Sequence, residues 1–82
     1  MTEVQIEYCV PCGFLPRAEE TEHKILSELG EGIEGLEMKP GHGGVFKVRV
    51  DGEVVFDKAH DTYDLDAISH RVAEHLRVSR TS

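Results

Sequence analysis

The sequence predicts an α/β fold of two layers, with elements in the order β-α-β-β-β-α. Val4, Ile6 and Tyr8 alternate with polar residues, which is typical of a short strand. Two β-rich runs flank Asp51-Gly52, the dipeptide of a two-residue hairpin. Apolar residues recur at helical spacing in two further segments. We therefore expect a four-stranded mixed sheet with both helices on one face.

The first helix is predicted to begin near Leu15 and to end at Gly30. Its apolar face has helical spacing and consists of Ala18, Ile25 and Leu29. Pro16 is compatible with the first helical turn, where its missing N–H would have no partner. A second strand is predicted at 33–38 and a loop at 39–44. The β-α-β unit should be a right-handed crossover, which makes its two strands parallel.

The hairpin register follows from its turn. A two-residue turn at Asp51-Gly52 pairs Val50 with Glu53 and Val48 with Val55. One face of the hairpin should then carry Phe46, Val48, Val50 and Val55. The other face should carry Val45, Lys47, Arg49, Val54 and Phe56, and we expect it to be partly open, with an apolar group that suits a protein partner.

The last helix is predicted from an apolar row and a cap. The row has i, i+3, i+7 and i+11 spacing and consists of Leu65, Ile68, Val72 and Leu76. Asp64 stands before it as an N-cap. With 82 residues, the chain has room for one domain, which we assign to 1–82.

The composition disfavours several functions. The chain has 16 acidic and 9 basic residues and a formal charge of −7, so binding to nucleic acid or to a membrane is not expected. The acidic surplus fits an ordinary acidic protein or a high-salt cytosol equally well. The N-terminus lacks a signal-peptide pattern and no run has transmembrane length, so we expect a cytoplasmic protein. No nucleotide-binding motif is present, and no cofactor is expected.

The two cysteines, Cys9 and Cys12, are the strongest functional signal. Their CxxC spacing could belong to a redox pair, to half of a metal site or to two inert buried thiols. They lie between a predicted strand and a predicted helix, where N-terminal amides stabilise a thiolate. Zinc would need further ligands at short spacing, but the histidines are scattered, at His23, His42, His60, His70 and His75. The redox pair is therefore favoured, with no metal.

These motifs carry a family resemblance over nearly the whole chain. The sequence resembles the selenoprotein W-like (Rdx) family, a branch of the thioredoxin-like fold. The matching residues are Tyr8-Cys9, the CxxC, the run Gly13-Phe14-Leu15-Pro16-Arg17, and the run Gly44-Val45-Phe46-Lys47-Val48. The resemblance implies a thiol oxidoreductase that acts with glutathione or protein dithiols.

The resemblance also implies a role for each cysteine. Cys12 occupies the position that is selenocysteine in the selenoprotein members, which makes it the attacking group. Thioredoxin uses its first cysteine instead, so the order of attacker and resolver stays open between Cys9 and Cys12.

Residues near the pair have two interpretations each. Arg17 could lower a thiol pKa or attract an anionic thiol, or it could be a solvated helix residue. Phe14 and Tyr8 could form a docking rim or belong to the core. His42 and His60 are expected to be exposed.

Two functions follow from these observations. The first is a small cytoplasmic thiol–disulfide oxidoreductase that acts on protein or small-molecule thiols, with glutathione among them. The second is a redox-sensing interaction module without turnover, which would bind a protein at the CxxC rim or the open sheet face. Assay of thiol turnover against a general disulfide would separate the two.

Overall fold

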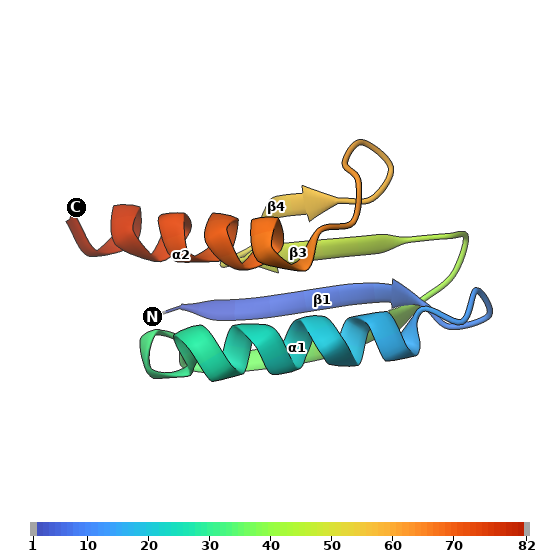
Figure 1. The fold of residues 1–82 in the computed structure, drawn as a ribbon, viewed down its shortest axis with the longest axis horizontal. Coiled ribbons are helices and arrows are strands. Elements are labelled where there is room, and N and C mark those ends of the chain that lie inside the picture. Colours follow the sequence, from blue (N-terminus) through green and yellow to red (C-terminus); the bar gives the residue numbers. More distant parts are fainter. Residues whose placement is uncertain (1, 82) are drawn as a thin grey trace.

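The elements of the computed structural model follow the predicted order (Figure 1). It describes the backbone of residues 2–81 and the side chains of residues 2–76. The elements are β1 (Glu3–Cys9), α1 (Leu15–Leu29), the 3-10 helix η1 (Gly30–Gly32), β2 (Gly35–Gly41), β3 (Phe46–Val50), β4 (Glu53–Asp57) and α2 (Leu65–Thr81). The strand order is β2-β1-β3-β4, and β1 pairs parallel with β2 and antiparallel with β3. The predicted mixed sheet is confirmed.

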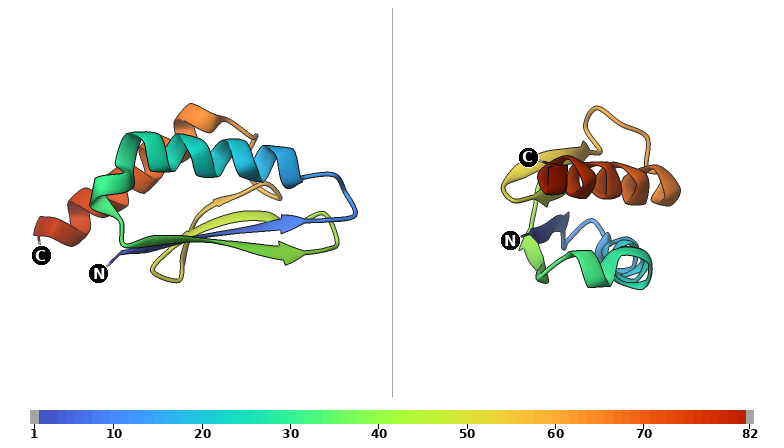
Figure 2. Two further views of the ribbon diagram at one scale, coloured as in Figure 1. Left: turned by 90° about the horizontal axis from the view of Figure 1, so that it is seen from below. Right: turned by 90° about the vertical axis from the view of Figure 1, so that its left-hand side faces the viewer.

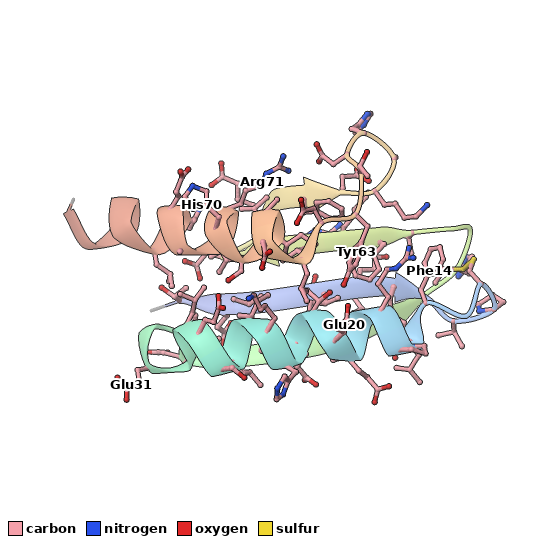
Figure 3. All side chains as sticks on the ribbon, in the orientation of Figure 1. Phe14, Glu20, Glu31, Tyr63, His70 and Arg71 are labelled. Carbon is pink, nitrogen blue, oxygen red and sulfur yellow. A yellow bond between two sulfur atoms is a disulfide. The ribbon has the colours of Figure 1, made fainter. Side chains whose placement is uncertain are left out.

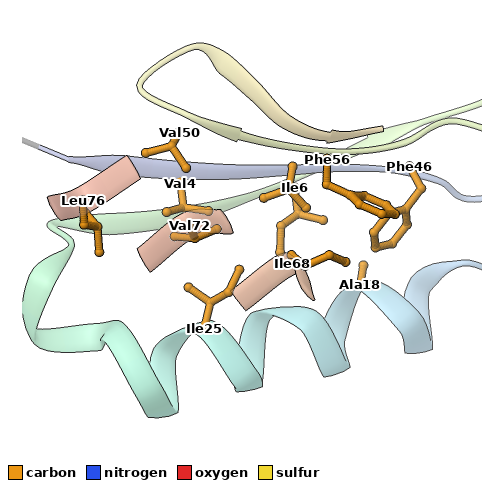
Figure 4. Packing of buried hydrophobic residues seen from close by; sticks show 11 residues of the cluster. Val4, Ile6, Ala18, Ile25, Phe46, Val50, Phe56, Ile68, Val72 and Leu76 are labelled. Carbon is orange, nitrogen blue, oxygen red and sulfur yellow. The ribbon is translucent and has the colours of Figure 1, made fainter. Parts of the chain in front are cut away.

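Both helices cover the same face of the sheet, as predicted (Figure 2). The core lies between these two layers, and Figure 4 shows side chains from the strands meeting those of α1 and α2. Its buried members are Val4, Ile6, Ala18, Ile25, Phe46, Val48, Val50, Phe56, Ile68, Val72 and Leu76. The alternation in β1 and the helical spacing in α1 and α2 thus predicted most core-facing residues of these elements. Leu65 is not among the core residues, and Thr21, which was not predicted, is buried.

The predicted hairpin register is wrong only from Val48 onward. Val50 faces Glu53 as expected, but a bulge between Val48 and Arg49 makes Val48 face Phe56 instead of Val55. A bulge adds one residue to one strand and so reverses which residues face the core beyond it. Phe56 is consequently buried at 1% exposure. The largest apolar side chain expected on the open face lies in the core.

The turn itself has the predicted chemistry. Asp51 and Gly52 have φ values of 52° and 85°, the positive values that a type I′ turn requires at both central residues. The Asp51 carboxylate also accepts a hydrogen bond from the Glu3 N–H at 2.9 Å. This bond ties the hairpin to the start of β1.

The second strand differs from its predicted range. It runs from Gly35 to Gly41, so it includes Pro40, which we expected in a loop. β2 lies at the edge of the sheet and pairs only with β1. An edge strand tolerates proline because one side of its backbone needs no ladder partner. Composition alone therefore indicated a loop where the edge position permits a strand.

The ends of the helices follow from local chemistry. The Asp64 carboxylate accepts a hydrogen bond from the Ala67 N–H at 3.2 Å, which confirms the predicted N-cap of α2. Phe14 precedes α1 without a side-chain cap, and Pro16 lies in the first turn. Over the described residues, neither helix is long and apolar enough to cross a membrane.

The open face of the sheet is polar. Arg49 Nη1 donates to Glu7 Oε1 at 2.8 Å and to Gln5 Oε1 at 3.3 Å. Gln5 in turn donates to Glu37 at 2.7 Å. Val54 on the edge strand is 46% exposed, but Phe56 is in the core. The apolar group expected on this face is therefore reduced mainly to Val54.

Ion pairing on this face lowers the pKa of Glu7. The largest cause is the hydrogen bond from Arg49, and the positive charges of Lys39 and Lys47 act in the same direction, whereas burial opposes them. A lowered carboxyl pKa in the folded state means that the unfolded state binds the proton more tightly. The ionised Glu7 side chain therefore stabilises the fold at neutral pH.

The bulge predicts that two apolar side chains of β4 differ sharply in their contribution to stability. Phe56→Ala should lower the free energy of unfolding by about 3–5 kcal/mol, since it leaves a cavity in the core. Val54→Ala should change it by no more than about 0.5 kcal/mol, because the side chain is half exposed. Urea denaturation measures both. If both variants lowered the free energy of unfolding by similar small amounts, Phe56 would not be in the core and the register without a bulge would be correct.

The Glu7–Arg49 pair predicts a pH dependence. Glu7→Gln should lower the free energy of unfolding by about 1 kcal/mol at pH 7, because the pair is partly exposed. This difference should persist above the ordinary glutamate pKa of about 4.3. It should disappear as the pH falls through the lowered pKa, where Glu7 itself becomes protonated. Urea denaturation at pH 7 and at acid pH measures it, with exposed Glu31→Gln as control. If the stability difference between the protein and Glu7→Gln did not change with pH, it would not come from the ionised Glu7–Arg49 pair.

Candidate functional site

Cys9 and Cys12 form a disulfide at one end of the molecule. Their Cα atoms are 5.3 Å apart. Cys9 is the last residue of β1, and Cys12 lies in the turn that leads to α1. Figure 3 shows the yellow sulfur atoms next to Phe14, at the end of the sheet that is remote from the N-terminus.

The turn between the cysteines is closed by its own backbone. The Gly13 N–H donates to the Val10 carbonyl at 3.1 Å, and the Phe14 N–H donates to the Cys9 carbonyl at 3.3 Å. Pro11 and Gly13 occupy the second and fourth positions of this turn, where type I turns favour them. Gly13 has a φ of 76°, which a residue with a side chain rarely adopts. The residue types of the CVPCG segment thus specify the turn that holds the sulfurs together.

The loop between β2 and β3 anchors this turn from the side. The Cys9 N–H donates to the Val45 carbonyl at 2.8 Å, and the Val10 N–H donates to the Gly41 carbonyl at 3.0 Å. A Cβ atom at Gly41 would lie 2.9 Å from Val45 Cγ1 and 3.3 Å from Glu7 Oε2, so any other residue there would displace these side chains. The segment 41–44 therefore contacts the cysteine turn through the backbone of its first residue, Gly41. The next residue, His42, is exposed.

The two sulfur-bearing residues differ in exposure. Cys9 is fully buried at 0%, whereas Cys12 is exposed. A nucleophile from solution can approach the disulfide at Cys12 but not at Cys9. The arrangement is thus chemically asymmetric, with one sulfur for contact with a partner and one sulfur inside the protein.

An aromatic cluster supports the turn. The Phe46 ring meets the rings of Phe14, Phe56 and Tyr63 edge to face, at centroid distances of 6.3, 6.1 and 5.7 Å. Edge-to-face contacts of this kind stabilise by about 0.5–1.5 kcal/mol beyond burial of the rings. Phe14, which we considered for a docking rim, is therefore a half-buried support of the site. Tyr8 is also half-buried and packs against the core.

Tyr63 was not predicted to belong to the site. Its hydroxyl donates to Glu20 Oε1 at 3.2 Å and lies 3.1 Å from Thr21 Oγ1. Burial is the main cause that raises the pKa of Tyr63 above its ordinary value, so the hydroxyl keeps its proton at neutral pH. Tyr63 stands in an irregular segment before α2, and an aromatic residue amid polar ones there was the only signal in the sequence.

Two cations surround the aromatic rings near Cys12. The Arg17 guanidinium carbon lies 4.6 Å from the Tyr63 ring centroid and 5.5 Å from that of Phe14. Lys58 Nζ lies 5.4 Å from the Phe14 centroid. Distances within about 6 Å are those of cation–π attraction. Arg17 is therefore held against the site instead of extending into solvent.

A shallow groove passes from Cys12 along the first turns of α1. It is lined by residues of the turn, of α1 and of the segment before α2: Cys12, Gly13, Phe14, Arg17, Glu20 and Tyr63. Figure 3 shows Glu20 on α1, Tyr63 before the start of α2, and Phe14 next to the sulfur atoms. A partner that reaches the Cys12 sulfur would lie in this groove.

The other predicted candidates lie apart from the groove. His60 is exposed in the segment after β4, where its N–H donates to the Asp57 carbonyl at 3.0 Å. Within the described residues, no three His, Cys, Asp or Glu side chains come together in an arrangement that could hold a metal ion.

Comparison with known proteins finds a matching family and two relatives. The model of the Rdx family matches residues 3–74. Migration and invasion enhancer 1 of Bos taurus is 33% identical over 70 residues, which are 79% of this chain and 57% of that protein. The Mus musculus protein of the same name is 35% identical over 57 residues, 67% of this chain and 46% of that protein. The chain thus spans about half the length of these relatives.

Two crystal structures are similar in fold. A protein from Bordetella parapertussis superposes with a TM-score of 0.85 at 28% identity, over 90% of this chain and 96% of that one. A selenoprotein W-related protein from Vibrio cholerae superposes with a TM-score of 0.84 at 21% identity, over 92% of this chain and 96% of that one. The fold of this chain is therefore also seen in crystal structures.

Proposed function

The chain belongs to the Rdx family, as its motifs indicated, and from this membership we propose that it is a thiol–disulfide oxidoreductase. Cys9 and Cys12 would alternate between a disulfide and two thiols. The observation that carries the proposal is the asymmetry of the pair, in which Cys12 is exposed and Cys9 is fully buried. An exchange reaction needs one accessible sulfur and one sulfur that waits beside it.

The reaction on the oxidised protein starts at Cys12. A partner thiolate attacks the Cys12 sulfur, a partner–Cys12 disulfide forms, and the bond to Cys9 breaks with Cys9 as the leaving thiolate. A second partner thiol then attacks the partner sulfur, which releases the partner disulfide and leaves Cys12 as a thiolate. Both cysteines take up protons, and two electrons pass from the partner thiols to the protein. In the reverse direction Cys12 attacks and Cys9 resolves.

The surroundings of Cys12 support its role as the attacking group. It lies just before α1, whose N-terminal end favours negative charge. The Arg17 cation lines the same groove. Both features favour a thiolate on Cys12, and Cys9 lacks the exposure that attack on a partner requires. We propose protein dithiols and small thiols such as glutathione as partners, and the cytoplasm as the location, since thiols are kept reduced there.

The alternative function, a redox-sensing module without turnover, has less support. It was based on an apolar group on the open face of the sheet. Phe56 lies in the core, and Arg49, Glu7 and Gln5 form a polar network on that face. Turnover at the cysteine pair is therefore the better supported function.

Variants of the two cysteines test the proposal. Cys9→Ala removes the resolver, so incubation of the reduced variant with glutathione disulfide should accumulate a stable mixed disulfide at Cys12. Cys12→Ala removes the attacking group and should form little or none, because the remaining thiol is buried. Intact mass and peptide mapping measure the adducts.

Thermal denaturation of both variants is the control, since Cys9 is a core residue and Cys12 is not. If folded Cys12→Ala protein formed adducts on Cys9, Cys9 would be the attacking group and Cys12 the resolver. Folded Cys9→Ala protein that forms no adduct would contradict the proposed function.

A further inference from the structure

Two positive side chains lie near the groove at Cys12: Arg17 lines it, and Lys58 contacts the Phe14 ring that lines it. Lys24, Arg49 and Arg71 each form an ion pair with an acidic residue. Among the side chains that the structure describes, no carboxylate oxygen lies within 4.0 Å of the charged nitrogens of Arg17 or Lys58. Lys39 and Lys47 have no such partner either. Arg17 and Lys58 differ from them because both lie against aromatic rings, and Arg17 lines the groove at Cys12.

The acid that lines the groove, Glu20, is hydrogen-bonded to Tyr63 and keeps its negative charge. Glu20 accepts the hydrogen bond of the Tyr63 hydroxyl at 3.2 Å. Arg17 contacts the Tyr63 ring, at 4.6 Å from its centroid. Tyr63 thus contacts Glu20 through its hydroxyl and Arg17 through its ring. The positive charge of Arg17 remains available to a bound molecule.

Both cations are attached to ordered parts of the fold. Thr21 donates to the Arg17 carbonyl at 2.8 Å within α1, and the Tyr63 ring that carries the guanidinium packs on Phe46. The Lys58 N–H donates to the Phe46 carbonyl at 3.0 Å. Binding an anion between these groups would cost less ordering than it would with two free surface side chains.

We propose that this site selects protein thiols that carry an acidic residue next to the reactive cysteine. The inference rests on the proposed function, because the partner must reach Cys12. Once the partner sulfur is joined to Cys12, a neighbouring carboxylate would be within reach of Arg17, which lines the same groove, and near Lys58, which contacts Phe14. The partner is a peptide segment, since the groove continues beyond Cys12 along α1 as far as Glu20.

The negative charge of the whole chain does not oppose this selection at close range. Charges farther away than about 8 Å are largely screened at physiological ionic strength. The cations at the groove act on the partner carboxylate at contact distance. Local charge therefore decides the preference, although the formal charge of the chain is −7.

A set of cysteine peptides tests the selection. Three peptides differ only in the residue next to cysteine, which is Asp, Asn or Lys. The rate at which each reduces the Cys9–Cys12 disulfide is divided by its rate with 2-hydroxyethyl disulfide, which corrects for the reactivity of each thiol. We expect the Asp peptide to exceed the Asn peptide by roughly three- to tenfold, the size expected for one or two partly exposed charge pairs, and the Lys peptide to be slowest.

Charge-matched variants assign the preference to the groove. Arg17→Gln with Lys58→Gln should bring the Asp and Asn peptides to equal corrected rates. Lys39→Gln with Lys47→Gln removes the same charge from β2 and β3, outside the groove, and should leave the preference intact.

The outcomes separate the two proposals. Equal corrected rates for all three peptides would overturn the selection and leave the oxidoreductase standing. A preference that survives in the groove variant would also overturn it. Failure of every peptide to reduce the disulfide would overturn the proposed function and the selection with it.

Discussion

Phe46 joins the three segments on which the cysteine site depends. Its ring contacts Phe14 before α1, Phe56 of β4 and Tyr63 before α2. Its carbonyl accepts the Lys58 N–H. Because Phe46 is the first residue of β3, which pairs with β1, these contacts place the end of β1, the cysteine turn and the Arg17–Lys58 pair in one rigid arrangement.

The same constraint explains how an acidic chain presents a cationic site. Arg17 rests on Tyr63, which packs on Phe46, so its position follows from ring packing and not from an ion pair. On the opposite face of the sheet, Arg49 is engaged with Glu7 and Gln5. Arg49 is thus paired with an acidic neighbour, whereas Arg17 lies against aromatic rings in the groove at the exposed sulfur.

Features set by local chemistry could be predicted from the sequence. The Asp51-Gly52 turn, the Asp64 cap and the helical spacing of α1 and α2 each depend on residues close together in the chain. Features set by neighbours in space could not. The bulge that buries Phe56 depends on packing against the helices. Tyr63 joins the site mainly through contacts with residues distant in the chain, Phe46, Thr21 and Glu20. The cysteine pair could be predicted from its spacing, but the difference in burial between Cys9 and Cys12 could not.

The measurement that tests the central claim most directly is a redox titration of the cysteine pair. The protein is equilibrated in a series of glutathione buffers, and its free thiols and intact mass are determined. We expect a reversible two-electron transition between disulfide and dithiol, with a midpoint between about −300 and −120 mV, the range of working thiol oxidoreductases. A pair that stays reduced in every buffer, or a disulfide that no buffer reduces, would contradict the account and leave the cysteines with a structural role.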